Sequence, residues 1–356
     1  MGDADLYEYD LPRELIAQEP LADRPAARLL HLHRRTGIIA HRRVRDLPDI
    51  LRAGDLLVVN DTQVLPARLR GRRLETGGAW EGLFLRAASD EEHPGAWVIL
   101  AQTRGRMHPG ERIVLRDRSD ADAGMLHLVG RTAGGGWLAM PDEQGPFAAI
   151  LARVGHVPLP GYIRKGMAVA ADIDRYQTIF AREPGSAAAP TAGLHFTPEL
   201  LTTLAERGVH KAAVTLHVGL DTFRPISTES VAEHPMHSEW CACPAETVAA
   251  IREAKARGGR VVAVGTTAVR TLETAARAGG VADSLVPWSG TTDLFIRPGF
   301  DFRVVDCLLT NFHMPRTTLM VLVCTFASQS LIEQAYAVAI QERYRFLSYG
   351  DAMLID

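Results

Sequence analysis

Lysine, cysteine and long apolar runs are scarce in this sequence of 356 residues. Of its 39 Lys and Arg residues only Lys165, Lys211 and Lys255 are lysine, and its four cysteines do not make a disulfide framework, which indicates a reducing compartment. The longest apolar run, residues 319–324, is far too short to span a bilayer, and the acidic first residues lack the apolar core of a signal peptide. We therefore expect a cytoplasmic protein that has no membrane partner.

Nucleotide-binding glycine motifs are absent as well. Neither a Walker A sequence nor a G-x-G-x-x-G motif occurs, so a P-loop or dinucleotide-binding fold is not indicated. The net charge of −3 gives no overall sign of nucleic-acid binding. Hydrophobic residues make up 47% of the chain, which is enough to bury a core in one large domain or in two.

Two kinds of hydrophobic pattern divide the chain. Residues 67–150 contain short apolar runs such as "WEGLFLRA", "AWVILAQ" and "ERIVLRD" between turn signals, without a helical period, which is typical of a small antiparallel barrel or sandwich. Elsewhere strands and helices alternate, which is typical of an α/β domain. We therefore predict an α/β core of residues 1–66 and 151–356, interrupted by an inserted all-β domain at residues 67–150.

Local signals place the elements of the α/β part. Thr197-Pro198-Glu199 has the residue types of a helix N-cap, first position and first turn. Strands are expected at residues 54–61, 212–218, 260–265 and 302–309, and helices from residue 198, near 245–257, from 266 or 267, and near 331–343.

The first candidate site is the segment "GSAAAPTAG" at residues 185–193, which carries no large side chain and leads to His195. Small residues let the backbone approach a ligand closely, and an imidazole beside them could transfer protons. An alanine-rich linker is the alternative interpretation, and the residues alone do not separate the two.

Two strand–helix junctions are further candidates. In "VVAVGTTAVRTLE", Gly265, Thr266 and Thr267 stand where a strand ends and a helix begins, so free N–H groups could bind a carboxylate or phosphate. In "LLTNFHMPRTTLM", His313 and Arg316 follow a strand, a combination suited to acid–base chemistry beside an anion. The alternatives are a plain strand–helix turn and a histidine whose partner is the backbone.

Histidines and cysteines recur between residues 217 and 243. His217 lies on a predicted strand, with Asp221 and Arg224 just beyond it. Cys241 and Cys243 are closer together than the cysteines of structural zinc sites, and no second ligand pair follows at a suitable distance. We expect both cysteines on a strand and no metal site.

Arginines are clustered locally. Residues 28–45 contain six Arg and three His but no acid, and Arg68, Arg70 and Arg72 alternate along a predicted strand, so that all three project from one face. Guanidinium groups suit phosphates, so an RNA backbone could bind here. The alternative, which the residues by themselves favour, is a solvated arginine-rich surface with acids nearby.

Several motifs together resemble one family. The segments "GDLLVVNDTQVLPARLRG", "GSAAAPTAGLHFT", "MHSEW", "VVAVGTTAVRTLE", "LLTNFHMPRTTLM" and "YRFLSYGDAMLI" occur in the expected order. They resemble segments of the S-adenosylmethionine:tRNA ribosyltransferase-isomerases of queuosine biosynthesis. The resemblance runs from residue 7 to residue 355 and is weakest in the inserted β region.

This resemblance implies a fold and a reaction. The fold is an α/β core with a semi-open β-barrel and surrounding helices, plus a small inserted Greek-key barrel. The reaction transfers and isomerises the ribosyl moiety of S-adenosylmethionine onto 7-aminomethyl-7-deazaguanine at the tRNA wobble position, giving epoxyqueuosine-tRNA, adenine and methionine. S-Adenosylmethionine is then a cosubstrate, and no metal or prosthetic group is needed.

The implied chemistry assigns roles to the candidate residues. A base must remove a proton from the ribose 5′ carbon beside the sulfonium, an acid must meet the departing adenine, and the methionine carboxylate needs a cation or a helix N-terminus. The expected catalytic residues are His195, His313 and Arg316. The expected cosubstrate-binding residues are Thr191, Gly193, Gly265, Thr266, Thr267 and Arg270, and the expected tRNA-binding residues are Arg34, Arg35, Arg42, Arg43, Arg68, Arg70 and Arg72.

Two other functions stay open at this point. A small-molecule methyltransferase that uses S-adenosylmethionine would release S-adenosylhomocysteine, and a non-catalytic RNA-binding module would leave the His- and Thr-rich loop ends idle. No heptad pattern or assembly segment stands out in the sequence, so we expect a monomer.

Overall fold

The computed structural model describes residues 2–88, 92–219, 225–279 and 285–356, and these form two compact units. The first unit comprises Met1–Gln63, Gln177–Glu183 and Ala188–Asp356, and the second comprises Val64–Tyr176 and Pro184–Ala187. The second unit takes in residues 151–176 in addition to the expected insertion, because strand β11 (Gly155–His156) pairs with β5 (Arg68–Arg73).

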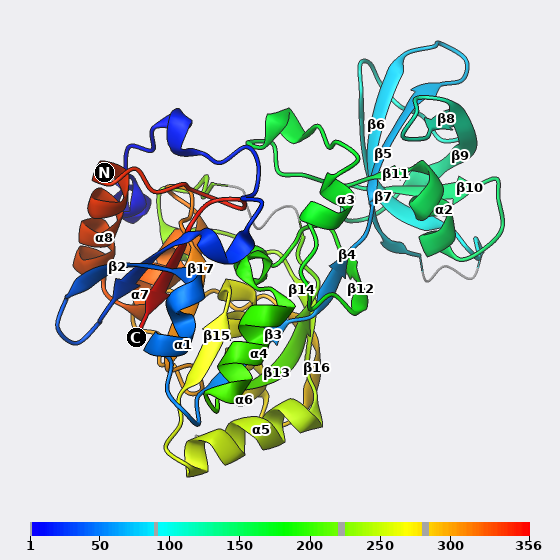
Figure 1. Ribbon diagram of the computed structural model, residues 1–356. Helices are drawn as coiled ribbons and strands as arrows, with labels where there is room; N and C mark the ends of the chain where they lie inside the picture. The colour runs from blue at the N-terminus through cyan, green and yellow to red at the C-terminus, as the bar shows by residue number, and fades with distance from the viewer. Residues whose placement is uncertain (1, 89–91, 220–224, 280–284) are drawn as a thin grey trace. The chain divides into compact units, whose positions relative to one another are not determined.

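A mixed nine-stranded sheet lies at the centre of the first unit (Figure 1). Across the sheet, the strands are β16 (Trp288–Thr292), β14 (Glu239–Cys243), β13 (His210–Leu216), β3 (Leu56–Asn60), β15 (Val261–Val264), β17 (Cys307–Asn311), β18 (Ala352–Ile355), β1 (Arg28–Leu32) and β2 (Ile39–Arg43). Strands β13, β3, β15 and β17 are parallel neighbours, as are β18 and β1, and the other neighbours are antiparallel. The predicted α/β strands are thereby confirmed, although β17 begins later than expected.

Helices connect these strands. They are α1 (Leu47–Ile50), α4 (Pro198–Glu206), α5 (Ala245–Ala256), α6 (Thr266–Ala278), α7 (Thr318–Phe326) and α8 (Gln329–Gln341), with short 3₁₀ turns η1 (Asp3–Tyr7), η2 (Arg13–Leu15), η3 (Arg24–Ala26), η4 (Val44–Asp46), η6 (Thr191–His195) and η8 (Val231–Glu233). The Thr197 side chain accepts a hydrogen bond from the Leu200 backbone N–H (3.3 Å), which confirms the predicted N-cap. In the described ranges no single helix is long and apolar enough to cross a membrane. Helices α7 and α8 meet these criteria only when they are taken together, and they are bent by 113° relative to each other.

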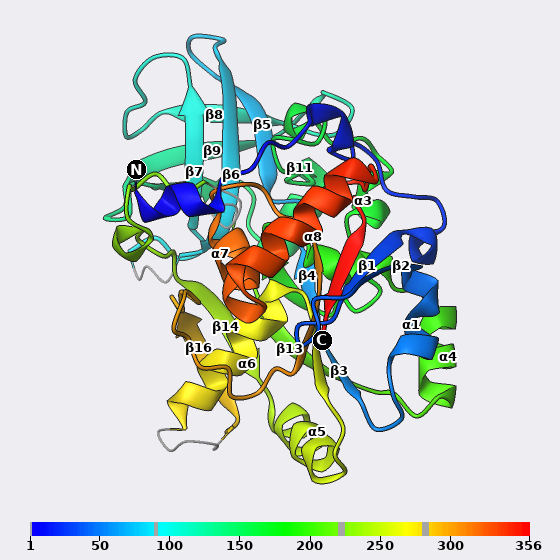
Figure 2. The same ribbon diagram turned by 90° about the vertical axis from the view of Figure 1, so that its left-hand side faces the viewer.

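The two faces of the sheet bury different helices. Leu57 and Val59 on β3 pack in one cluster with Leu200 and Leu204 on α4. Helices α5 and α6 contact β13, β3 and β15 from the other face, and Figure 2 shows α1 and α4 on one side of the sheet and α6 on the other. Alternate strand residues face opposite sides, so fully apolar strands such as β3 and β15 are buried on both faces.

The second unit is built on a closed antiparallel barrel. Its strands follow the order β5, β6 (Ala79–Ala87), β7 (Trp97–Thr103), β10 (Trp137–Pro141), β9 (Asp122–Arg131) and β8 (Arg112–Arg116), and β8 pairs back onto β5. Trp80, Trp97 and Trp137 are buried. The unit also contains α2 (Phe147–Val154), η5 (Arg164–Gly166) and α3 (Asp172–Arg175), while β4 (Thr62–Val64) and β12 (Glu183–Ser186) form a separate two-stranded sheet. The predicted inserted β-barrel is confirmed as a closed six-stranded antiparallel barrel, although α2 begins at Phe147, within the stretch expected to be all-β.

The last described residues lie in the middle of the first unit's sheet. Strand β18 pairs with β17 on one side and with β1 on the other. The preceding Phe346 and Leu347 are buried, as expected for a segment that packs on the core. Leu347 adopts a left-handed backbone (φ 68°), so the turn before β18 holds a non-glycine residue in an unfavourable conformation.

Candidate functional site

The carboxyl ends of the parallel strands form one edge of the sheet. Asn60 ends β3, His217 follows β13, Gly265 follows β15 and Asn311 ends β17. Ligands of open α/β sheets bind outside the carboxyl ends of the strands. The small-residue segment reaches this edge, because η6 contacts β17. Sequence motifs that are far apart along the chain therefore meet here.

Asn311 joins two of the predicted site residues. Its Oδ1 accepts a hydrogen bond from the Thr191 hydroxyl (2.8 Å), and its Nδ2 lies 3.3 Å from Nε2 of His195. The same Nδ2 faces the backbone carbonyls of Leu347 (3.3 Å) and Asp351 (3.4 Å). These carbonyls can only accept, so the amide nitrogen must point toward His195 and the amide oxygen toward Thr191.

His195 is a neutral histidine in this arrangement. An amide N–H can only donate, so Nε2 of His195 accepts and the ring proton lies on Nδ1. Burial lowers the pKa of His195 to about 4, and the positive charges of Arg24 and Arg345 act in the same direction. The ring is 5% exposed. An unprotonated nitrogen at neutral pH is what a general base requires.

His313 is held by its backbone and by one hydroxyl. Its Nε2 lies 2.8 Å from the Thr310 hydroxyl, and its backbone N–H donates to the Tyr336 hydroxyl (2.9 Å). Tyr9 donates a hydrogen bond to the His313 carbonyl. Burial lowers the pKa of His313 to about 3, so this ring is also neutral at physiological pH.

Arg316 points toward acids of the N-terminal segment. Its Nη1 lies 3.2 Å from Oδ1 of Asp5 and its Nε 3.9 Å from Oε2 of Glu8. Its backbone N–H donates to the Tyr7 carbonyl (3.0 Å), and its φ of 53° is left-handed. In the structure Arg316 is therefore paired with carboxylates of the N-terminal segment, so the anion-binding role expected for it stays a prediction.

Two glycines allow close packing around the small-residue segment. A Cβ on Gly193 would lie 3.1 Å from Cγ2 of Thr178, so Thr178 would have to shift slightly. Gly265, before the first turn of α6, has φ 92°, and a Cβ there would lie 3.6 Å from Cβ of Ala192. The backbone conformation of Gly265 therefore favours glycine, and Ala192 of the small-residue segment lies beside the start of α6.

The N-terminus of α6 carries an unsatisfied hydroxyl. Thr266 and Thr267 occupy its first turn and are 6% and 7% exposed. Among the described residues, Oγ1 of Thr267 has no hydrogen-bond partner. A buried hydroxyl without a partner costs free energy, and the first N–H groups of a helix lack intrahelical acceptors. This turn is therefore equipped to bind a polar or anionic group.

Arg270 is engaged in a buried ion pair. Its Nη1 bonds a carboxylate oxygen of Glu239, and its Nε donates to the Leu294 carbonyl (3.2 Å). The other Glu239 oxygen accepts from the Gly219 N–H (2.8 Å). Arg270 and Glu239 line a pocket of about 440 Å³, counted with the solvent at its mouth, together with His234, His237, Phe295 and Thr318. The arginine shapes this pocket, but its charge is already neutralised by Glu239.

His217 and Asp61 are further polar groups at the strand ends. Nδ1 of His217 lies 2.8 Å from the Thr62 hydroxyl, and its ring stacks on Trp240 with centroids 5.0 Å apart. Asp61 accepts from the Thr215 hydroxyl (2.7 Å), and burial raises its pKa. Asp221 and Arg224, which the sequence placed beyond His217, lie outside the described residues.

Sequence reasoning missed Asn311 and Asp61. Each of them lies inside a motif that was noticed for another residue: Asn311 two residues before His313, and Asp61 in "VVND". Their position at strand ends was the available signal, because polar side chains at the carboxyl edge of a parallel sheet are typical of sites.

Cys241 and Cys243 lie on a strand, β14, as predicted. All four cysteines are free and buried. Burial raises the pKa of the Cys241 thiol to about 11. In the described parts of the chain, these two cysteines do not belong to any group of side chains spaced to hold a metal ion.

The predicted arginine clusters lie in separate units. In the first, Arg34 donates to the Phe326 carbonyl (3.0 Å) and is half-buried, and Arg43 donates to the Ala26 carbonyl (2.9 Å), whereas Arg35 and Arg42 are exposed. A phosphate could reach the last two without displacing a carbonyl.

The barrel of the second unit carries the other cluster. Arg68 pairs with Glu81 and Arg72 with Asp122, both at 2.7 Å. Arg70 and Arg68, together with Arg118, lower the pKa of His156, after burial as the main cause. His156 therefore lies near several arginines, and two of the predicted arginines, Arg68 and Arg72, are paired with acids.

Comparison with known proteins agrees with the resemblance seen in the motifs. A family model described as queuosine biosynthesis protein matches residues 4–355. Proteins named S-adenosylmethionine:tRNA ribosyltransferase-isomerase from Symbiobacterium thermophilum and Moorella thermoacetica are 50% identical over 351 residues and 48% identical over 349 residues, and each alignment covers 98% of both chains. The crystal structure of S-adenosylmethionine tRNA ribosyltransferase from Thermotoga maritima is 37% identical, with a TM-score of 0.55 over 99% of this chain and 100% of that one. The chain belongs to the queuosine biosynthesis protein family.

Proposed function

We propose that this chain is an S-adenosylmethionine:tRNA ribosyltransferase-isomerase that acts on 7-aminomethyl-7-deazaguanine at the tRNA wobble position. The full-length identity to proteins of that name supports the activity. The observation that carries the chemistry is a neutral, buried His195 that contacts Asn311 at the carboxyl end of β17. S-Adenosylmethionine serves as cosubstrate, and the reaction needs no prosthetic group.

His195 is the proposed base for the proton on the ribose 5′ carbon. The Asn311 amide has two hydrogens and faces three acceptors, namely His195 Nε2 and two carbonyls at 3.3–3.4 Å. If His195 gives up its hydrogen bond with Asn311, both amide hydrogens still have a carbonyl acceptor, so little free energy is lost. Thr191 fixes the other side of the amide, so the histidine can exchange partners without movement of Asn311.

The start of α6 is the proposed site for the polar end of the cosubstrate. Its free N–H groups and the Thr267 hydroxyl suit a carboxylate. Gly193 and Gly265 contribute backbone without side chains to the proposed cosubstrate site, and the Thr191 hydroxyl oxygen can accept a hydrogen bond from the ligand while it donates to Asn311. Arg270 acts through the shape of the pocket that it lines with Glu239.

His313 and Arg316 are the proposed second acid–base and anion-binding residues. His313 exchanges protons through the Thr310 hydroxyl, which lies 2.8 Å from its Nε2. Arg316 binds an anion only by giving up Asp5 and Glu8, so its role requires a rearrangement of the N-terminal segment.

The proposal extends to the fold and the state of the protein. The barrel of the second unit is proposed to be a Greek key, because in the order β8-β5-β6-β7 the fourth strand returns beside the first. The core is proposed to contain a semi-open barrel, and the protein to be a cytoplasmic monomer.

The products distinguish this function from its rivals. Incubated with S-adenosylmethionine and precursor tRNA, the protein should release adenine and methionine in equal amounts, and it should release neither without the tRNA. S-Adenosylhomocysteine among the products would instead indicate a methyltransferase. Binding of the tRNA without any turnover would indicate an RNA-binding module.

Charge reversal should reveal the tRNA contacts. Arg35→Glu combined with Arg42→Glu removes two exposed cations of the first unit and should lower the salt slope of log affinity for precursor tRNA by about 2, close to one per lost phosphate contact. Arg257→Glu is the matched control, because Arg257 is exposed directly after α5 in the same unit and pairs with Glu253. Filter binding at several salt concentrations measures both quantities. Equal slopes for the double variant and the control would remove Arg35 and Arg42 from the interface.

A further inference from the structure

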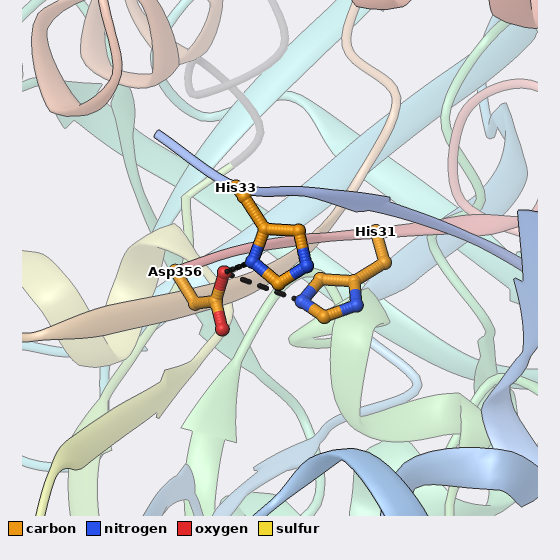
Figure 3. Close-up of side chains that lie close together, drawn as sticks. All are labelled: His31, His33 and Asp356. Carbon is orange, nitrogen blue, oxygen red and sulfur yellow. Dashed lines mark ion pairs between the residues drawn. The ribbon is translucent and has the colours of Figure 1, made fainter. Parts of the chain in front are cut away.

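Three side chains that the proposed reaction does not use converge at the opposite edge of the sheet (Figure 3). His31 lies on β1, His33 follows that strand, and Asp356 follows β18. The end of β18 pairs with the beginning of β17 (Ile355 with Leu308), so this cluster is remote from Asn311 at the other end of β17.

The strand register explains the convergence. Leu32 pairs with Ile355 in the parallel ladder, so the next residues, His33 and Asp356, come opposite each other. His31 precedes His33 by two positions and points to the same face of the strand. In Figure 3 both imidazoles and the carboxylate point toward one another.

The three groups present their donor atoms to one point. Oδ1 of Asp356 lies 2.7 Å from Nδ1 of His33 and 3.2 Å from Nε2 of His31. All three atoms lie within 4.8 Å of one another. Arg260 holds the second carboxylate oxygen (Nη1 to Oδ2, 3.2 Å) and also bonds Asp55, so the carboxylate is oriented with Oδ1 toward the histidines.

Two of these atoms lack a satisfying partner. Nε2 of His31 and Oδ1 of Asp356 are buried and lie 3.2 Å apart, and this contact satisfies both atoms only where a proton lies between them. Buried polar atoms without a partner are rare in native structures and call for an unseen ligand or ion.

We propose that His31, His33 and Asp356 bind a divalent transition metal of the zinc class. Two imidazole nitrogens and one carboxylate oxygen form a ligand set that zinc accepts, with water completing a tetrahedron. Ligand atoms of a tetrahedral zinc lie about 3.4 Å apart, so His33 must move outward slightly from its 2.7 Å contact. The His33 side chain is 41% exposed, which permits this movement and gives the ion a route from solvent. The metal would join β1 to β18 and would not take part in the reaction.

Metal titration of the full chain, untagged and treated with chelator, tests the site. One Co²⁺ per chain should bind and give the visible absorption of a tetrahedral or five-coordinate ion, and Zn²⁺ should displace it and raise the Tm. His33→Ala and Asp356→Asn should each lower the Co²⁺ affinity by at least about tenfold. His127→Ala is the matched control, because His127 also contacts a carboxylate, that of Asp142, without belonging to a three-residue group among the described side chains.

Thermal stability measured with and without metal separates a metal site from an ion-pair network. His33 is partly exposed, so His33→Ala should leave the chelator-treated chain folded, as circular dichroism can verify. The proposal expects that this variant loses only the zinc-dependent increase in Tm. Absence of stoichiometric Co²⁺ binding, or an equal loss of Tm in chelator and in zinc, would overturn it.

Discussion

Replacing His195 by alanine is expected to lower kcat by roughly 10²–10⁴-fold, the usual contribution of a positioned acid–base group. The imidazole is buried and neutral at the carboxyl edge of the sheet, and its Nε2 carries no proton. Affinity for S-adenosylmethionine should change little, because the polar end of the cosubstrate is assigned to the start of α6. Steady-state kinetics on precursor tRNA, with calorimetry for cosubstrate binding, separates the two effects.

The pH profile provides a second measurement for the same residue. Burial lowers the pKa of His195 to about 4, so this group stays ready to accept a proton between about pH 6 and pH 8 and should impose no acid limb there. His195→Gln preserves the bulk of the ring if the alanine variant folds poorly. His210→Ala is the control, since His210 is an exposed histidine of the same unit. Turnover of His195→Ala within about twofold of the unmodified chain would exclude proton transfer by this residue.

Acid should destabilise the fold well above the pH at which carboxylates titrate. His195 and His313 have folded-state pKa values of about 4 and about 3, below the value of 6.5 for an exposed histidine. As the pH falls below 6.5, these two histidines become protonated in the unfolded chain but stay neutral in the folded chain. Their contribution to the free energy of unfolding is therefore fully present above pH 6.5 and is lost toward pH 3–4. For the two groups together the loss between about pH 7.5 and pH 5 is about 4 kcal/mol, an upper figure. That is a large share of a typical stability of about 5–15 kcal/mol.

Urea unfolding at several pH values measures this loss. Burial also lowers the pKa of His217, which adds to the loss of stability at low pH. Burial raises the pKa of Asp61 and Asp351, and protonation of these two carboxyls in the folded chain opposes that loss. The contribution of the two deeply buried histidines is isolated by the double variant His195→Gln, His313→Gln. Its stability should fall much less between pH 7.5 and pH 5. An unchanged slope in that variant would show that other groups cause the acid sensitivity.

Elements with local signals could be predicted from the sequence. Thr197 and Pro198 mark the start of α4 because capping and proline preferences act within one turn. The apolar runs of β3 and β15 are recognisable because both faces of these strands are buried. Strands β1 and β18 are also apolar and buried, but their place in the sheet depends on pairing between residues 28–32 and 352–355, which no local pattern records.

The candidate site shows the same division. Gly265 and His195 could be identified from residue type, since a positive φ requires glycine and proton transfer favours imidazole. The partners of these residues could not. Asn311 meets Thr191 and His195 across more than a hundred residues, and the acids that bind Arg316 and Arg270 lie on other segments. Such contacts follow from tertiary packing, which no local pattern records.

The interior position of β18 has a consequence for synthesis of the protein. Strand β1 is made long before β18, and in the finished sheet β18 separates β1 from β17. After the β1–β2 hairpin has been made, the edge of β1 that pairs with β18 therefore stays unpaired until residues 352–355 have left the ribosome. Such long-range closure slows folding and leaves an edge open to chaperones or to neighbouring nascent chains in the meantime.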